Sequence, residues 1–358
     1  MKVLSDSQRV AVVGGGVAGC AVAYELSRAG FQVVLFERDE IAAHASGKNA
    51  GNLNPLHGTP RGLIPMALEA LKIHAEIKAE LEDLGSGNYG TSLLNRVHLG
   101  YDEVDRLQLE KIVALYNAHM GFSATWLDGS ELHKLEPRLA SDVQFAVLTT
   151  GGLTLDSYEF TNALATGATK CGAVIVRESV LGVATSGGRV TGIQTRQGQT
   201  PCDAIVLATG PWVAETREWL GLDLAIAPVK GELLLLAMPD VEIGYDFTWQ
   251  AACLYRRRGN QVWVGGTQTK CGLDCVPTAE ARESLMDGAA RMMPAIRHAR
   301  LLDHIAALRP ITLSNEPIAS RAEGWENVYI ANGGGFKGVL LSVAVARKIR
   351  CLLLDEGR

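Results

Sequence analysis

A glycine-rich turn between two apolar runs dominates the N-terminal part of the chain. The run Val10–Val13 leads into Gly14-Gly15-Gly16-Val17-Ala18-Gly19, and an alanine-rich segment then reaches Gly30 and a second apolar run that ends at Glu37. This order predicts a strand, a glycine turn, a helix and a strand, which is the unit that binds the ADP half of a dinucleotide. The order of elements therefore predicts a parallel sheet with a nucleotide crevice.

The glycines of this turn have separate physical roles. Gly14 permits the tight turn out of the strand, Gly16 lets the backbone approach a pyrophosphate, and Gly19 lets the helix pack closely on the sheet. The helix begins near Val17 and Ala18, where unpaired N–H groups and a partial positive charge face the phosphates. A glycine turn without a ligand is the alternative interpretation.

The second strand ends in an acid followed by a base. A carboxylate at Glu37 is placed to accept hydrogen bonds from both ribose hydroxyls, and it disfavours a 2′-phosphate. We expect Arg38 to line the same site. Farther along the chain, Val180 and Trp212 are the other expected contacts of the nucleotide.

Three later glycine-rich segments favour a flavin over a nicotinamide. Small residues after the Glu37 strand let the backbone wrap a pyrophosphate and the edge of an isoalloxazine, and the expected contacts there are Ala45, Ser46, Asn49, Ala50, Gly51 and Asn52. A short buried strand ends in Ala208, Thr209 and Gly210. The third segment precedes the last helix, whose N-terminus is suited to stabilise negative charge on a reduced flavin; its expected contacts are Gly334, Gly335, Phe336, Lys337 and Gly338.

The length and the order of elements predict two intertwined domains. At 358 residues the chain is too long for one simple core. We expect an α/β protein that combines a Rossmann-like FAD-binding domain with a parallel sheet and a substrate domain with a mainly antiparallel sheet. The expected division is 1–84, 146–222 and 304–358 for the FAD-binding domain, and 85–145 and 223–303 for the substrate domain.

Composition and charge exclude several classes of protein. The net charge is −5 and no long basic run occurs, so nucleic-acid binding has no electrostatic support. The polar N-terminus resembles no signal peptide, which makes the cytoplasm the expected location and leaves peripheral contact with the inner membrane open. Cys271 and Cys275 are an alternative metal or redox pair, but two cysteines without nearby histidines make a poor zinc site, and we expect no metal.

Beyond these motifs, nearly the whole chain resembles the D-amino-acid oxidase-type flavoproteins, and within them the branch of glycine oxidase and the D-amino-acid dehydrogenases. The resemblance rests on the N-terminal fingerprint, on the segments 228–232 (PVKGE) and 308–310 (LRP), and on 335–338 (GFKG) with the closing helix. It implies non-covalent FAD, a substrate bound on one flavin face and oxidation of a C–N bond. It also implies that Arg309 pairs with the substrate carboxylate.

Two positions depart from the glycine oxidase pattern. Cys253 stands where that pattern has a tyrosine that helps hold the carboxylate, and Tyr255 follows two positions later on the same strand face. Phe336 stands where the pattern has a second arginine. These departures indicate a substrate that is larger or more apolar than glycine.

The chemistry of hydride transfer needs few protein groups. Arg309 suits the carboxylate anchor because a guanidinium binds a carboxylate through two parallel hydrogen bonds; a structural ion pair is its alternative role. Lys337 and Tyr255 are the other expected catalytic residues. No histidine stands out as a general base: His44 and His57 flank the small-residue loop, whereas His298 and His304 fall in a predicted helix and turn.

The resulting prediction is an FAD-dependent oxidoreductase that oxidises a small amino acid or N-substituted amino acid to an imine, which then hydrolyses. Oxygen or a respiratory acceptor would reoxidise the flavin. Two alternatives remain: a 2-hydroxy acid dehydrogenase on the same fold, and a flavoprotein subunit that is active only with a partner. The oligomeric state, whether a homo-oligomer or a subunit of a complex, stays open.

Overall fold

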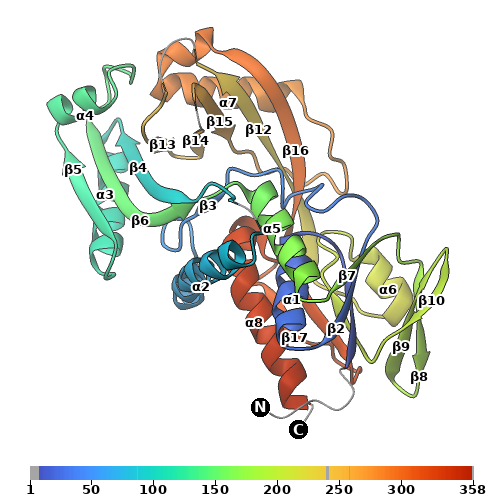
Figure 1. The fold of residues 1–358 in the computed structure, drawn as a ribbon. Coiled ribbons are helices and arrows are strands. Elements are labelled where there is room, and N and C mark those ends of the chain that lie inside the picture. The colour runs from blue at the N-terminus through green and yellow to red at the C-terminus, as the bar shows by residue number, and fades with distance from the viewer. Residues whose placement is uncertain (1–7, 87, 239–241, 258, 357–358) are drawn as a thin grey trace.

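Two large sheets and one small sheet make up the protein (Figure 1). This computed structural model describes residues 8–86, 88–238, 242–257 and 259–356; the first seven residues, on which the signal-peptide prediction depends, lie outside this part. The predicted combination of a parallel sheet with a mainly antiparallel sheet is confirmed. Among the described residues, no helix has both the length and the apolar character needed to cross a bilayer.

The nucleotide-type sheet has six strands. In spatial order they are β17 (Ile318–Arg321), β18 (Val328–Asn332), β11 (Ala204–Leu207), β1 (Arg9–Val13), β2 (Gln32–Glu37) and β7 (Val174–Arg177). All neighbours pair in parallel except β17 with β18. The predicted strand–turn–helix–strand unit is therefore present as β1, α1 (Val17–Arg28) and β2.

Alternate residues of β1 enter two different cores. Val10 and Val12 pack under the helices, whereas Ala11 and Val13 face the small sheet on the other side, as the two-residue period of a strand requires. The helices on the first face are α1, α2 (Ile64–Asp83), α5 (Ser157–Lys170) and α8 (Gly338–Glu356). The small sheet consists of β8 (Gly182–Ser186), β9 (Arg189–Thr195) and β10 (Gly198–Pro201), next to α6 (Ala214–Leu220) in Figure 1.

The second large sheet has nine strands and is antiparallel except where β13 pairs with β4. Its strands are, in order, β16 (Arg300–Thr312), β12 (Ile226–Ala237), β15 (Gln261–Gly265), β14 (Ala252–Arg256), β13 (Asp246–Trp249), β4 (Ser92–Gly100), β6 (Phe145–Thr154) and β3 (Asn52–Leu53), with β5 (Ser123–Leu127) beside β6. Helices α3 (Glu103–Asn117), α4 (Gly129–Leu135) and α7 (Ala279–Met292) pack against it, and short 3₁₀ turns occupy Arg61–Leu63, Pro294–His298 and Gly335–Lys337.

Two faces of this nine-stranded sheet differ in character. One face is apolar and packs in a core that includes Val97, Phe247, Leu254 and Val264. Residues next to these in the same strands line a cavity on the opposite face, and several of them, such as Arg96 and Thr248, are polar. The alternation sets up the site described below, because it brings side chains from several strands onto one surface.

Two boundaries of the predicted division into discontinuous domains fall inside strands. The boundaries at 146 and 304 fall inside β6 and β16, and both strands belong to the nine-stranded sheet. The expectation that His304 lies in a helix or turn is wrong: it lies within β16, which pairs with β12 along almost its whole length. His298 ends a 3₁₀ turn.

Candidate active site

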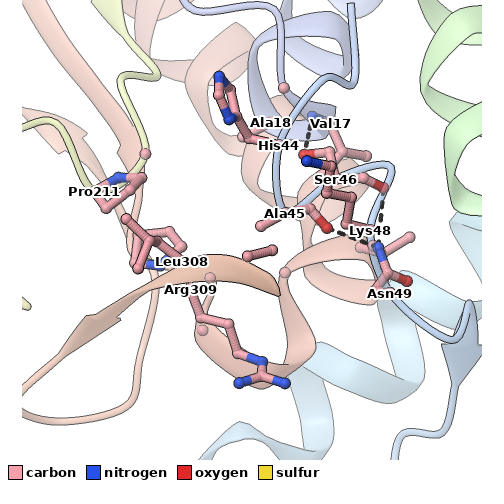
Figure 2. A pocket seen from close by; sticks show the side chains of 18 of the residues that line it. Val17, Ala18, His44, Ala45, Ser46, Lys48, Asn49, Pro211, Leu308 and Arg309 are labelled. Atoms are coloured by element: carbon pink, nitrogen blue, oxygen red, sulfur yellow. Dashed lines mark hydrogen bonds between the residues drawn. The ribbon is translucent and has the colours of Figure 1, made fainter. Parts of the chain in front are cut away.

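A cavity of about 870 Å³ is lined by residues of both large sheets. Every residue predicted for the site lines it except Gly19. The N-terminal turn, the loop after β2, the end of β11 and the start of α8 thus meet in one place, together with Arg309 and Tyr255 from the nine-stranded sheet. Figure 2 shows Val17, Ser46 and Arg309 around the cavity. Their individual roles toward a cofactor remain predictions.

The glycine turn leaves no room for a side chain at Gly14 or Gly19. Gly14 has a φ of +111°, and a Cβ there would collide with the carbonyl oxygen of Ala208. A Cβ on Gly19 would collide with the carbonyl oxygen of Gly14, so Gly19 packs the helix on the turn and does not reach the cavity. At Gly16 a Cβ would meet only the Ser46 hydroxyl, at 3.1 Å, and the Gly16 backbone is open to the cavity. This arrangement fits a pyrophosphate held by backbone groups.

The small-residue loop is fixed to the start of α1. The backbone N–H of Val17 donates to the Ser46 hydroxyl oxygen at 2.9 Å, and the Asn49 side-chain amide donates to the carbonyls of Ala45 and Ser46, both at 2.9 Å (Figure 2). The Glu37 carboxylate accepts hydrogen bonds from the N–H groups of Gly15 and Asp39. Glu37 therefore supports the glycine turn as well as standing where the ribose is expected.

Aromatic and charged side chains form the wall beside Glu37. The guanidinium of Arg38 lies over the Trp212 ring, 4.4 Å from its centroid, and the His44 ring lies 4.6 Å from the same ring. His44 also contacts Asp39, with 2.8 Å between Nε2 and Oδ2, and this hydrogen bond lowers the pKa of Asp39. His44 is thus committed to a structural contact at this end of the cavity.

Lys337 ties the start of α8 to the loop after β3. Its ammonium nitrogen donates to the carbonyl oxygens of Asn54, at 2.9 Å, and His57, at 2.7 Å. Burial, and next the charge of Arg96, lower the pKa of Lys337 to about 7. A lysine that changes charge near neutral pH beside a helix N-terminus is suited to hold a proton at a cofactor that gains negative charge.

The side chain of Arg309 extends from β16 across the neighbouring strand β12 at Gly231, which has no side chain. A Cβ on Gly231, in the adjoining strand β12, would occupy the space of the Arg309 guanidinium. The guanidinium donates from Nη1 to the carbonyl oxygen of Thr267 at 3.1 Å and lies 5.1 Å from the Phe336 ring centroid. Burial lowers its pKa. Among the described residues no carboxylate pairs with it, so the alternative of a structural ion pair finds no partner there.

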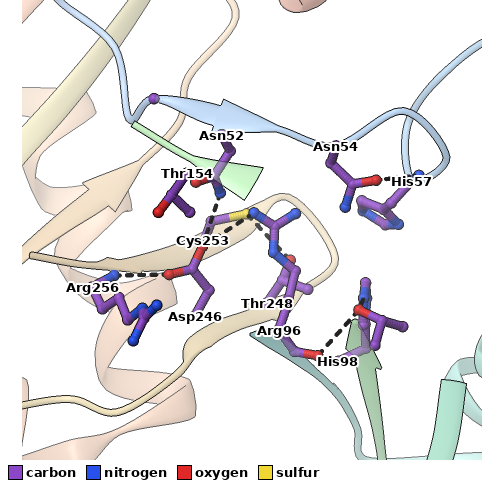
Figure 3. Close-up of polar contacts among 12 residues, drawn as sticks. Asn52, Asn54, His57, Arg96, His98, Thr154, Asp246, Thr248, Cys253 and Arg256 are labelled. Atoms are coloured by element: carbon purple, nitrogen blue, oxygen red, sulfur yellow. Dashed lines mark hydrogen bonds and ion pairs between the residues drawn. The ribbon is translucent and has the colours of Figure 1, made fainter. Parts of the chain in front are cut away.

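Sequence reasoning did not find a second buried arginine in the cavity wall. Arg96 lies on β4 and is 5% exposed; its Nη2 is 3.4 Å from Oδ2 of Asp246, which is 1% exposed (Figure 3). The signal that was available is the alternation along β4, where Arg96 and His98 alternate with the core residues Val97 and Leu99. A lone arginine in a strand forms no motif, and its partner lies far away in the sequence.

The cavity contains a histidine that is unsuited to act as a base near neutral pH. The His57 ring lies 4.8 Å from the His98 ring, and burial, followed by the charge of Arg96, lowers the pKa of His57 to about 3.

His304 contacts Glu232, with 2.9 Å between Nε2 and Oε2, and neither residue lines the cavity. Cys271 and Cys275 are free cysteines, and within the described stretches no group of three or more His, Cys, Asp or Glu residues is placed to hold a metal.

Comparisons with known proteins agree with this geometry. The glycine oxidase of Geobacillus kaustophilus is 26% identical over 337 residues, covering 93% of this chain and 89% of that protein. The hydrogen cyanide synthase subunit HcnC of Pseudomonas protegens is 26% identical and covers 97% and 92%. The crystal structure of the Geobacillus kaustophilus glycine oxidase superposes with a TM-score of 0.89 at 25% identity, covering 98% of this chain and 95% of that chain. A model of the DAO family, described as FAD dependent oxidoreductase, matches residues 9–352, and the chain therefore belongs to this family of FAD-dependent oxidoreductases.

Proposed function

We propose that the protein oxidises the C–N bond of a small amino acid or N-substituted amino acid, with FAD as the hydride acceptor. The observation on which this rests is Arg309, a half-buried guanidinium that faces the cavity without a carboxylate partner among the described residues. The glycine loops at the other end of the same cavity fit FAD. The resemblance to proteins named glycine oxidase supports the amino acid as substrate class.

The residues of the chain bind and orient the substrate. Arg309 holds the substrate carboxylate through two parallel hydrogen bonds, which fixes the α-carbon relative to the cofactor. FAD, when bound, supplies the ring that accepts a hydride from that carbon. Lys337 and the N-terminus of α8 line the same cavity and would favour negative charge on a bound cofactor.

The amine of the substrate must be neutral when the hydride leaves. We infer no enzyme base for this step, since His57 is uncharged but far too weak a base and Lys337 already donates to two carbonyls. The oxidation converts the C–N single bond of the substrate to the C=N double bond of an imine. Water hydrolyses this imine to a carbonyl compound and an amine or ammonia. Molecular oxygen or a respiratory acceptor would be the final oxidant of the reaction.

Two other functions are separable from this one. A 2-hydroxy acid dehydrogenase would use the same carboxylate anchor and the same hydride acceptor. A subunit role is favoured by the resemblance to HcnC, a protein named as a subunit. A purified protein that is inactive alone and gains activity with a partner protein would support the subunit role.

Anaerobic mixing of the holoenzyme with panels of amino acids, N-substituted amino acids and 2-hydroxy acids tests the proposal. The flavin should lose its visible absorbance with at least one amino compound, and ammonia or a primary amine should appear in proportion. Reduction of the flavin by hydroxy acids alone, without release of an amine, would refute the proposal.

A further inference from the structure

The substrate end of the cavity is cationic. Arg96, Arg309 and Lys337 line it, whereas the acidic residues that line the cavity in the described part of the chain come from the other end, at the carboxyl ends of β2 and β7 and from α6: Glu37, Glu40, Glu178 and Glu215. The α-carboxylate of an amino acid substrate would neutralise the guanidinium of Arg309. Asp246, buried beside Arg96, offsets much of the Arg96 charge. A second negative group would therefore be held by hydrogen-bond donors of Arg96 that Asp246 leaves unused, and not by net charge alone.

Arg96 is not fully used by its counter-ion. Its contact with Asp246 is a single 3.4 Å approach instead of a paired one. The Asp246 carboxylate already accepts from the Asn52 side-chain amide at 2.8 Å and from the Arg256 backbone N–H at 2.9 Å (Figure 3). The Nε atom of Arg96 is buried and has no hydrogen-bond partner. Nε itself is closed to the cavity, but Asp246 engages only Nη2, and among the described residues no acceptor is bonded to Nη1. Arg96, which lines the cavity, therefore keeps donor capacity at its terminal nitrogens.

Tyr255 connects the surroundings of the two arginines. The Arg96 guanidinium lies 5.5 Å from the Tyr255 ring centroid. On the other side are two adjacent glycines: a Cβ on Gly265 would lie 3.1 Å from the Tyr255 ring, and a Cβ on Gly266 would lie 3.7 Å from Nη2 of Arg309. Both arginines thus border the part of the cavity that Tyr255 lines.

We propose that the substrate is an amino or imino dicarboxylate, with one carboxylate on Arg309 and the second on Arg96. This assignment names the substrate class of the function proposed above and rests on it. Cys253 and Phe336 leave Arg309 as the one anchor expected for the α-carboxylate, and Arg96 supplies a second anchor from another strand. Arg96 is therefore a specificity-determining residue.

Binding of non-reactive acids to the oxidised holoenzyme tests the assignment without turnover. The flavin spectrum is followed during titration with acetate and with malonate, succinate and glutarate, which differ in the spacing of their carboxylates. The best dicarboxylate should bind about 10- to 100-fold more tightly than acetate, as an added hydrogen-bonded charge pair predicts. Arg96→Met should abolish most of this preference, whereas Arg309→Met should weaken both kinds of acid.

Three further variants keep the outcome clear. Arg96→Met combined with Asp246→Asn removes the buried charge that the single variant would leave unpaired, and Arg96→Lys should retain part of the preference. Arg350→Met is the matched control, because Arg350 also pairs with a buried carboxylate, Glu25, at 2.8 Å but lines no part of the cavity. It should leave the preference unchanged.

The results also separate this inference from the proposed function. Equal affinity of the wild-type holoenzyme for acetate and for every dicarboxylate would overturn it, as would an equal loss for both in the Arg96 variants. Flavin reduction by glycine but not by iminodiacetate, aspartate or glutamate would also count against it. If no amino compound reduces the flavin while the Arg96-dependent preference persists, the proposed C–N oxidation fails and the dicarboxylate site stands.

Discussion

The two ends of the cavity are built in different ways. At the nucleotide end, the decisive groups are backbone atoms of short contiguous segments, with Gly14 and Gly19 packed so tightly that a methyl group would collide. At the substrate end, the decisive groups are side chains, and Arg96, Tyr255 and Arg309 come from three different strands of one sheet. The first end is specified by local sequence, and the second by strand register.

The largest expected effect belongs to the nucleotide end. Gly14→Ala places a Cβ against the Ala208 carbonyl oxygen at a φ of +111°, so we expect a loss of at least about 3 kcal/mol of stability and loss of bound FAD. Gly30→Ala is the control, because Gly30 closes the same helix at a φ of +93° with nothing within 4 Å of a Cβ. It should cost only about 1–2 kcal/mol and keep FAD. FAD content and thermal unfolding measure both; equal effects would contradict the packing argument.

The same contrast explains what the sequence predicted. The β1–α1–β2 unit and all but one of the predicted cofactor contacts fall where expected around the cavity, because each segment has its own glycine pattern. Strand β6 was not predicted, since Gly151 and Gly152 interrupt its apolar run, and β16 was not predicted, since Asp303 and His304 lie within it. Both strands are defined by their partners in the sheet.

The arginines of the substrate end show the limit most clearly. Arg309 was found through a family pattern, not through its chemistry in the strand. Arg96 has a chemical role only beside Asp246, which pairs with it in register between β4 and β13. Nothing in either segment alone indicates that pairing, because register between distant strands is a property of the folded sheet.

Acid should weaken the scaffold of the nucleotide end. His74 on α2 is 3% exposed, contacts the carbonyl oxygens of Val339 and Leu340 at 3.2 and 3.1 Å, and burial lowers its pKa to about 4. The unfolded chain binds this proton near pH 6.5, so the stabilisation is full above pH 6.5 and is lost as the pH falls toward 4, by about 3 kcal/mol. His74→Gln should flatten the pH dependence of unfolding over that range. An unchanged slope would assign the acid sensitivity to other groups, such as His98.

Removal of the proposed carboxylate anchor should affect only the substrate end. Arg309→Met is expected to raise the substrate KM about 100-fold, because it removes two charge-assisted hydrogen bonds from a half-buried site, while FAD remains bound. Steady-state kinetics and the flavin absorbance of the purified variant measure the two quantities. Unchanged kinetics would remove Arg309 from the site, and loss of FAD would show that the two ends are not independent.

The smallest expected effect concerns the aromatic ring beside Arg309. Phe336 follows the glycines that lead into α8, and its ring lies 5.1 Å from the Arg309 guanidinium. Phe336→Leu removes a contact of about 0.5–1 kcal/mol and should raise KM about two- to fivefold. Phe336→Tyr keeps the ring and should leave KM within about twofold of the wild-type value. If Phe336→Leu instead lowers the FAD content and leaves KM unchanged, the ring belongs to the nucleotide end, and the boundary between backbone recognition and side-chain recognition lies on the far side of Phe336.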